Sequence, residues 1–365
     1  MRPEPGRGPN AFDRISDMVR ALERSLISVK HGVKSLTSGS FWLRYSTLAA
    51  YRTLCAGASA LTGLTRSGAR HADGNIEASV EYITSVFNMY RNAAGVERFY
   101  GKIAEIGPGD SCGIGLMFLA DGCSQVDLVD RFFSRRDKHH QQTVNRALVQ
   151  RLPQLSSLLR NGDYAESSFS RLSRHYGESA AAETFFQANR DYDFIVSCAV
   201  LEHVYDPLGA LASAASALRP GGLMLHQIDC RDHGQFSESF YELKFLELPD
   251  LLYSPLKWRG GPNRVRLSAY LDVLKKLGLD FTVYVNSMAG IAGEIPHGTL
   301  LRDVPEPVLR VSRQYVTDVR RRLTMPFRSM SDEDLMITRF VLVARKSDTM
   351  PASGVAGTGL HNAEL

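Results

Sequence analysis

The stretch KIAEIGPGDSCGIG, residues 102–115, is rich in glycines and contains two acids. Glu105 falls near the end of an apolar run that predicts a strand, and Gly107, Pro108 and Gly109 follow at once. Glycine adopts backbone angles that other residues avoid and leaves the main chain bare, so this turn suits the close approach of a ligand. A carboxylate so near the turn would repel a phosphate, which favours a ligand with a cationic group, such as an amine or a sulfonium.

A second acid, Asp130, ends the next apolar run, VDLVD, 25 residues after Glu105. In nucleotide-binding folds an acid at this place holds the ribose hydroxyls. A later run, YDFIVSC (192–198), leads into AVLEHVYDP. Ligands of open parallel sheets bind beyond the carboxyl ends of the strands. Ser197, Glu202 and His203 are therefore expected at the same edge as the glycine turn.

The elements that must position these residues alternate along the chain. Apolar runs predict strands at 102–106, 125–130, 192–198 and 222–229, with a weaker candidate at 171–176. Helical patterns lie between them, at 112–121, 134–151 and 207–218, and a helix–glycine–strand pattern at 268–285 precedes a last strand near 336–346. This alternation predicts an α/β fold with a sheet covered by helices on both faces.

Together, AEIGPGDSCGIG, VDLVD, YDFIVSCAVLEHVYDP and LRPGG resemble the class I S-adenosylmethionine-dependent methyltransferases over residues 76–346. The resemblance implies a Rossmann-like, seven-stranded sheet whose last strand, 337–345, inserts antiparallel. It also implies S-adenosylmethionine as the cofactor, with Glu183 of SAAAE (179–183) near the adenine. The remaining cofactor residues that it implies are Glu105, Gly107, Pro108 and Gly109 around the methionine part, Asp130 at the ribose, and Ser197.

A looser similarity concerns HQIDCRDHGQF and PNRVRLSAY, within residues 223–285. These segments are similar to methyltransferases of bacterial polysaccharide and secondary-metabolite gene clusters. Some ubiquinone-type O-methyltransferases carry an E-x-x-E-H metal site after the fourth strand. Here Ala199 replaces the first acid of that motif, so no metal is predicted.

Methyl transfer to a hydroxyl group benefits from a general base, and histidine suits that role because its pKa lies near neutral pH. Two candidates are left open. His203 follows the fourth strand, and His233 follows the fifth, beside Asp232, which would orient it. His226 lies within a strand and is expected to serve packing.

The acceptor side is expected in residues 234–268, where aromatic side chains gather. They could stack on a sugar or flat ring, or form the core of an inserted helical cap. The side chains proposed to bind an anionic or glycan acceptor are Tyr241, Asn263, Arg264 and Arg266.

Charge is uneven along the 365 residues: residues 1–70 hold eleven Lys and Arg but four Asp and Glu, although the net charge of the chain is +4. Residues 1–75 are expected to form a basic helical extension, with an amphipathic helix near 13–35. That helix could dock on its own domain, meet a partner helix or touch an anionic membrane surface. Residues 287–335 read as an insertion and 347–365 as a disordered tail. The odd number of cysteines, without CxxC spacing, favours a cytoplasmic protein.

The leading hypothesis is O-methylation of a small-molecule or glycan acceptor. Alternatives are N-methylation of a secondary metabolite and a non-catalytic protein with the same fold. A nicotinamide-dependent oxidoreductase is disfavoured, because the turn lacks G-x-G-x-x-G and Glu105 would repel a pyrophosphate. Nucleic-acid methylation is disfavoured because the basic excess lies outside the predicted catalytic domain. The oligomeric state is left open.

Overall fold

The computed structural model describes residues 42–43, 45–50, 53, 75–132, 138–165, 170–233, 235–236, 242–257 and 261–348, and the backbone of 363–364. The chain divides into two compact units, Met1–Leu61 and Thr62–Leu365. The few described residues of the first unit are helical. The predicted basic helix at 13–35 and most of the tail lie outside the described residues. Within the described residues, no helix is both long and apolar enough to cross a membrane.

The second unit is built on a mixed sheet with the strand order β10-β8-β9-β7-β6-β1-β2-β5. Neighbouring strands from β7 to β5 pair in parallel, whereas β9 pairs antiparallel with both β7 and β8. Apart from the two-residue strand β10 at one edge, the sheet has the seven predicted strands with an antiparallel insertion, and β5 confirms the weak strand candidate at 171–176. The strands are β1 (Gly101–Ile106), β2 (Cys123–Asp130), β5 (Leu172–Tyr176), β6 (Tyr192–Cys198), β7 (Leu218–Asp229), β8 (Asp280–Met288), β9 (Ile337–Arg345) and β10 (Ala363–Glu364), with a separate ladder of β3 (Leu159–Arg160) and β4 (Asp163–Tyr164).

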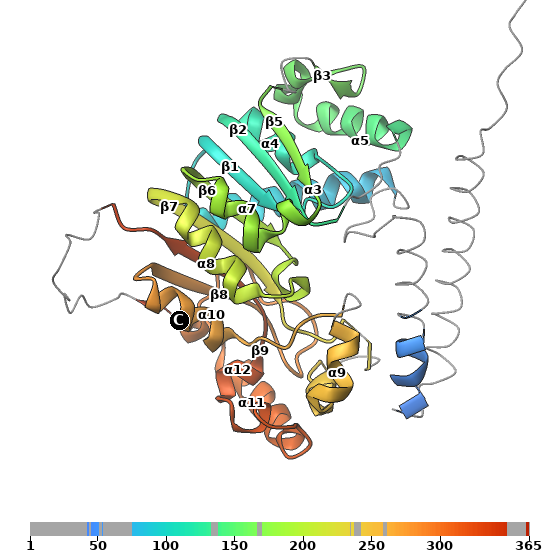
Figure 1. Cartoon of the computed structure of the whole chain (residues 1–365), viewed down its shortest axis with the longest axis vertical. Helices are drawn as coiled ribbons and strands as arrows, with labels where there is room; N and C mark the ends of the chain where they lie inside the picture. Colours follow the sequence, from blue (N-terminus) through green and yellow to red (C-terminus); the bar gives the residue numbers. More distant parts are fainter. Residues whose placement is uncertain are drawn as a thin grey trace, which may run out of the picture. The chain divides into compact units, whose positions relative to one another are not determined.

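Helices cover both faces of the sheet, as Figure 1 shows. On one face α3 packs against α4 and α5, and on the other α8 packs against α7 and α10. The helices are α3 (Ile76–Ala94), α4 (Gly113–Asp121), α5 (Lys138–Arg151), α7 (Ala182–Ala188), α8 (Pro207–Ala217), α9 (Asp250–Lys257), α10 (Leu267–Lys276), α11 (Glu306–Arg320) and α12 (Asp332–Met336). Short 3-10 turns are η1 (Pro153–Leu158), η2 (Glu178–Ala180), η3 (Leu201–His203), η4 (Lys244–Glu247), η5 (Leu301–Asp303) and η6 (Phe327–Ser329).

Local sequence sets the bounds of α3, the helix that precedes β1. The side chain of Asn75 accepts a hydrogen bond from the main-chain N–H of Glu77, which caps the helix start, and Gly95 ends the helix with a left-handed φ of 63°. Its apolar face carries Phe87, which packs edge-on against Phe99 and at a tilt against Phe118. This aromatic cluster fixes α3 and α4 against the sheet, and so fixes the turn between β1 and α4.

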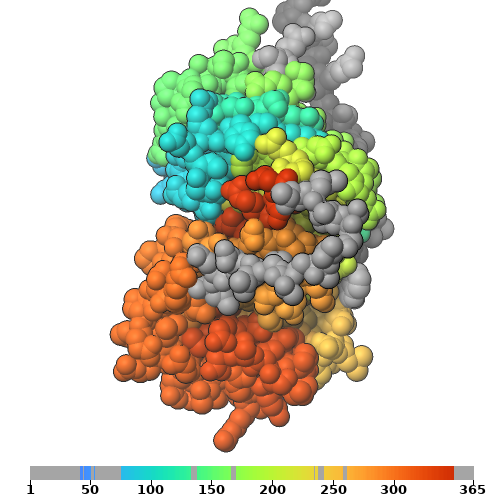
Figure 2. Space-filling view, turned by 90° about the vertical axis from the view of Figure 1, so that its left-hand side faces the viewer, coloured from blue at the N-terminus to red at the C-terminus, as the bar shows by residue number. Residues whose placement is uncertain are grey.

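Two segments differ from the prediction. β7 begins at Leu218, not at residue 222, because the LRPGG stretch pairs with the end of β9: Gly221 donates to the carbonyl of Lys346, and Lys346 donates to that of Gly222. In Figure 2 red atoms from the end of the described range lie between the blue-green and the orange parts of the unit. Residues 363–364 pair with β8, so the prediction of a disordered tail is wrong for those two residues.

The segment expected to hold aromatic side chains supplies a core. Phe236, Phe245 and Tyr253 are buried, and the Tyr253 hydroxyl donates to the carbonyl of Pro262 at 2.5 Å. For these three residues the structure favours the helical cap over stacking on an acceptor. Tyr241 and Trp258 lie outside the described residues.

Candidate active site

The turn after β1 leaves a bare stretch of main chain at the carboxyl edge of the sheet. Gly107 and Gly109 have left-handed φ angles of 71° and 65°. The Gly107 N–H donates to the Val129 carbonyl at 2.8 Å, which fixes the turn to β2. A Cβ atom at Gly107 would clash with the side chain of Val200, which follows β6. Only glycine fits between these two strand exits.

Glu105 is the buried acid of this turn, with 3% of its surface exposed. Burial, and then the neighbouring groups Cys198 and Glu105, raise the pKa of the Tyr82 hydroxyl on α3. Burial, and then the charge of Glu202, raises the pKa of the Cys198 thiol to about 12, so Cys198 is a neutral thiol at pH 7. Sequence reasoning missed Tyr82, because nothing along the chain marks which face of α3 meets the sheet edge.

Asp130 ends β2 next to the glycine turn. Its Oδ1 accepts a hydrogen bond from the N–H of Phe132 at 2.8 Å, and the residue is half-buried. Bare glycines, a buried carboxylate at Glu105 and an accessible carboxylate at Asp130 suit a ligand with an ammonium group at one end and a ribose at the other. The residues present therefore fit S-adenosylmethionine.

Two other predicted cofactor residues have partners within the protein. Ser197 is fully buried and its hydroxyl shares a 2.8 Å hydrogen bond with Nδ1 of His226, and its cofactor contact stays a prediction. Burial lowers the pKa of His226 to about 3, which keeps it neutral, as the expected packing role requires. Glu183 accepts a hydrogen bond from the N–H of Asp206, which ties the start of α7 to the loop before α8.

The two candidate histidines meet beyond the ends of β6 and β7. The ring centroids of His203 and His233 are 5.0 Å apart, edge to face. Ligand atoms of Glu202, His203 and His233 lie within 4.8 Å of one another. Ala199 and His233, at the exits of these strands, have φ angles of 54° and 53°. Left-handed backbone at non-glycine residues is uncommon and gathers at functional sites.

A half-buried ion pair lies beside this cluster. Asp229, the last residue of β7, accepts two hydrogen bonds from the Arg231 guanidinium at 2.8 and 2.5 Å. Burial would raise the pKa of Asp229, but the hydrogen bonds and charge of Arg231 outweigh it, so the pKa is lowered. The nearest carboxylate to His233 is Asp229, 3.8 Å from Nε2.

Asp232 was the acid expected to orient His233. Its Oδ2 accepts a hydrogen bond from the N–H of Phe236, so Asp232 also caps the following turn, and its role toward His233 stays a prediction. The acid at the end of β7 could have been found from sequence by the same strand-end signal that identified Asp130. The pKa of His233 is lowered by burial, against the opposing charge of Asp229.

Two further acids in this region lie in poorly hydrated surroundings. Burial raises the pKa of Glu202 well above its usual value, and Glu202 is only 1% exposed. Burial also raises the pKa of Glu242 to about 7, although Arg231 lowers it. Perturbed acids near a pair of histidines are typical of a functional site.

The segment NRVR supports the loops that carry the cluster. The Asn263 side chain donates to the carbonyls of Leu201 and Val204, which flank Glu202 and His203. Arg266 is 1% exposed and donates to the carbonyls of Cys230, Asp334 and Ile337. Arg264 lies over the rings of Tyr253 and Phe327 and pairs with Asp250. These contacts give the three side chains a structural role, and the predicted acceptor contacts stay a prediction.

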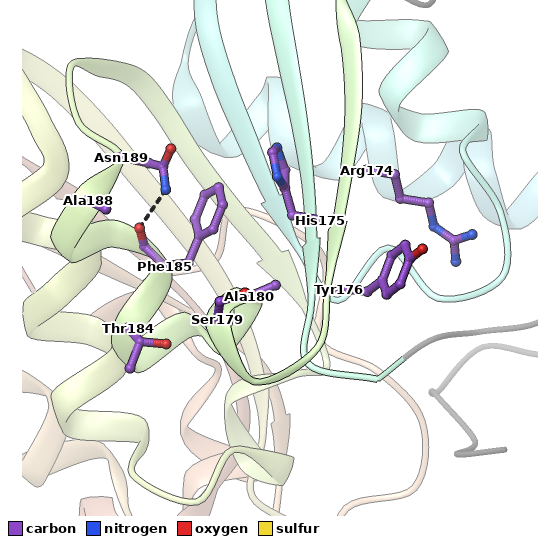
Figure 3. Close-up of a pocket in the computed structure, with 9 residues that line it drawn as sticks. All are labelled: Arg174, His175, Tyr176, Ser179, Ala180, Thr184, Phe185, Ala188 and Asn189. Atoms are coloured by element: carbon purple, nitrogen blue, oxygen red, sulfur yellow. Dashed lines mark hydrogen bonds between the residues drawn. The ribbon is translucent and has the colours of Figure 1, made fainter. Parts of the chain in front are cut away.

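A cavity of about 540 Å³ lies elsewhere, between β5 and α7. In Figure 3 His175 points from β5 toward Phe185 of α7, while Arg174 and Tyr176 point to the other side of the strand. The cavity shares Ser179 and Ala180 with the segment expected near the adenine, but neither His203, His233 nor a residue of the glycine turn lines it. It is therefore distinct from the candidate active site.

The sequence comparisons agree with this geometry. Residues 94–282, more than half the chain, match the family model described as a methyltransferase domain. The chain belongs to this family, and it is an S-adenosylmethionine-dependent methyltransferase with a class I fold. A curated relative, the ubiquinone biosynthesis O-methyltransferase of Parvibaculum lavamentivorans, is 33% identical over 85 residues. That match covers 21% of this chain and about a third (34%) of the relative.

Two solved structures show a low likeness to this chain. Phosphoethanolamine N-methyltransferase 2 of Haemonchus contortus, in complex with S-adenosylmethionine, is 16% identical with a TM-score of 0.38, over 72% of this chain and 52% of that chain. Geranyl diphosphate methyltransferase, in complex with the same cofactor, is 12% identical with a TM-score of 0.37, over 72% of this chain and 84% of that chain. Likeness this low does not identify an acceptor.

Asp130→Ala is expected to weaken S-adenosylmethionine binding at least tenfold, about 1.4 kcal/mol, because the ribose loses its carboxylate partner. Isothermal titration calorimetry measures this. Asp280→Ala, which removes an exposed carboxylate at the start of β8, is the matched control and should bind like the wild type. Equal affinity in the Asp130 and Asp280 variants would remove the ribose assignment.

Arg266→Met is expected to lower the free energy of unfolding by about 2–4 kcal/mol, because three buried carbonyls lose a charged donor. Urea denaturation measures the loss. Arg310→Met removes an exposed arginine of α11 and should stay within about 0.5 kcal/mol of the wild type. If the two variants were equally stable, the structural role of Arg266 would be refuted.

Proposed function

We propose that this enzyme methylates a hydroxyl group of a small-molecule or glycan acceptor, and that His203 and His233 activate this hydroxyl. The observation that carries the proposal is the meeting of both imidazoles at one sheet edge, with ring centroids 5.0 Å apart. The glycine turn lies at the same edge, since β1, β6 and β7 are successive parallel strands. An acceptor between the turn and the histidines would contact both.

The chemistry explains why such a pair is useful. S-adenosylmethionine supplies an electrophilic methyl carbon, and transfer to a hydroxyl forms a C–O bond, breaks the C–S bond with its electron pair left on sulfur, and releases the hydroxyl proton. An amine acceptor can attack through its own lone pair, whereas a hydroxyl is a weak nucleophile until its proton is removed or weakened. Two partly exposed imidazoles beside a half-buried Asp229–Arg231 pair suit the more demanding acceptor.

The remaining expectations about partners belong to this proposal. The protein acts in the cytoplasm on a soluble or lipid-linked acceptor, and residues 13–35 bring it to the inner membrane surface when the acceptor is lipid-linked. The basic, amphipathic sequence of that segment supports this part.

His233→Gln and His203→Gln are expected to lower kcat by about 10²–10⁴-fold, the usual contribution of positioned acid–base groups. Binding of S-adenosylmethionine should be unchanged, because neither side chain belongs to the glycine turn. His139→Gln, which changes an exposed imidazole on α5, is the control and should keep wild-type kcat.

The assay measures transfer of radiolabelled methyl groups from S-adenosylmethionine to nucleotide sugars, catechols and primary amines, with mass spectrometry of the products. Ether products would support the proposal. Transfer to amines alone would refute O-methylation, and a wild-type kcat in both histidine variants would refute their role in activation.

A further inference from the structure

Glu202, His203 and His233 form a cluster whose composition goes beyond a catalytic base. They come from two different strand exits, η3 after β6 and the loop after β7, yet their ligand atoms lie within 4.8 Å of one another. Ligands around a tetrahedral zinc ion at 2.0–2.1 Å are about 3.3 Å apart. His203 and His233 are exposed, so small rotations of their side chains are enough to close this gap.

Glu202 is the second and independent observation. The residue is 1% exposed, and no described residue makes a hydrogen bond of normal geometry to either carboxylate oxygen. A buried carboxylate without a partner is costly, so it must either hold a proton or face a cation. The nearby arginine does not meet this need, because the Arg231 guanidinium is already bound to Asp229 and lies near Glu242.

The backbone conformation of His233 also supports a functional role for this cluster. This residue has a left-handed φ of 53°, a conformation with a steric cost for a side chain that carries a Cβ. A left-handed turn directly after β7 carries the imidazole to within 5.0 Å of the His203 ring. The strain is understandable if the position of this ring is functional.

We propose that Glu202, His203 and His233 bind one divalent transition-metal ion at the acceptor side of the active site. Two imidazoles and one carboxylate are a ligand set of open catalytic sites for Zn²⁺ and Fe²⁺, with positions left for water or substrate. Imidazole nitrogen favours these ions over Mg²⁺, which prefers oxygen ligands. The ligand set therefore selects an ion of the zinc type.

The role of the ion in catalysis rests on the proposed function, although its binding does not. A hydroxyl group on a cation loses its proton more readily, so the acceptor oxygen becomes nucleophilic near neutral pH and the proton passes to solvent. The two histidines then act as ligands and not as bases. Asp229, 3.8 Å from Nε2 of His233, is placed to orient that ring from outside, as carboxylates do for metal-bound histidines.

The test uses the untagged full-length protein, freed of metal by chelation and titrated with Zn²⁺, Co²⁺ and Mg²⁺. We expect one Zn²⁺ per chain by mass spectrometry, visible absorption bands on addition of Co²⁺, and no competition from Mg²⁺ at equal concentration. His233→Asn and Glu202→Gln should weaken Zn²⁺ binding by more than the 10–100-fold that loss of an outer hydrogen-bond partner costs. Asparagine tolerates the left-handed backbone, so the variant keeps the fold.

His139→Ala measures adventitious binding by a surface imidazole and should leave the stoichiometry unchanged. The proposal is overturned if the wild type binds no stoichiometric Zn²⁺, or if His233→Asn binds it equally well. An infrared band of a protonated carboxyl group that Glu202→Gln removes, present with and without Zn²⁺, would also overturn it.

Methyl-transfer assays separate this inference from the proposed function. Full activity toward a hydroxyl acceptor after chelation would refute the ion and leave O-methylation standing. Stoichiometric Zn²⁺ in an enzyme that methylates only amines would support the metal site and refute O-methylation.

Discussion

The candidate active site depends on hydrogen bonds that the side chains of Asn263 and Arg266, just before α10, donate to main-chain carbonyls. Asn263 holds the turn that carries Glu202 and His203, and Arg266 holds the carbonyl of Cys230, three residues before His233. The two loops follow different strands, β6 and β7. Because one short segment binds both loops, the distance between them is set by the core and not by the exposed side chains of His203 and His233.

The buried carboxylates of this region differ in the counter-ion that each one has. Glu105 is buried under the glycine turn, where we expect the ammonium group of the bound cofactor to lie against it. Asp229 already has a counter-ion in Arg231. Glu202 has neither a cofactor ammonium group nor an arginine of its own as a counter-ion, and burial raises its pKa. An enzyme that keeps an acid in such a place gains stability when a cation or a proton arrives there, which links ligand binding to folding.

Sequence reasoning recovered the fold because the signals of its elements are local. Apolar runs, glycine stops and strand-end acids located β1, β2, β6 and the antiparallel β9, and the glycine turn came with its acid. Sequence reasoning failed for residues whose hydrogen-bond partners lie far away along the chain. Arginines in NRVR look like surface ligands, but Arg266 reaches carbonyls 36, 68 and 71 residues away. Asp232 lies beside His233 in sequence, yet Asp229 is the closer acid in space.

The same reasoning explains why a metal site would escape a motif search here. A linear E-x-x-E-H pattern needs all its ligands on one loop, and Ala199 breaks it. In a parallel sheet, however, the exits of neighbouring strands meet at one edge, so the β7 loop can supply a ligand that the β6 loop lacks. His233 stands 34 residues beyond Ala199 and still reaches Glu202 and His203. The loss of an acid from a motif therefore excludes a metal only if no adjacent strand exit carries a replacement.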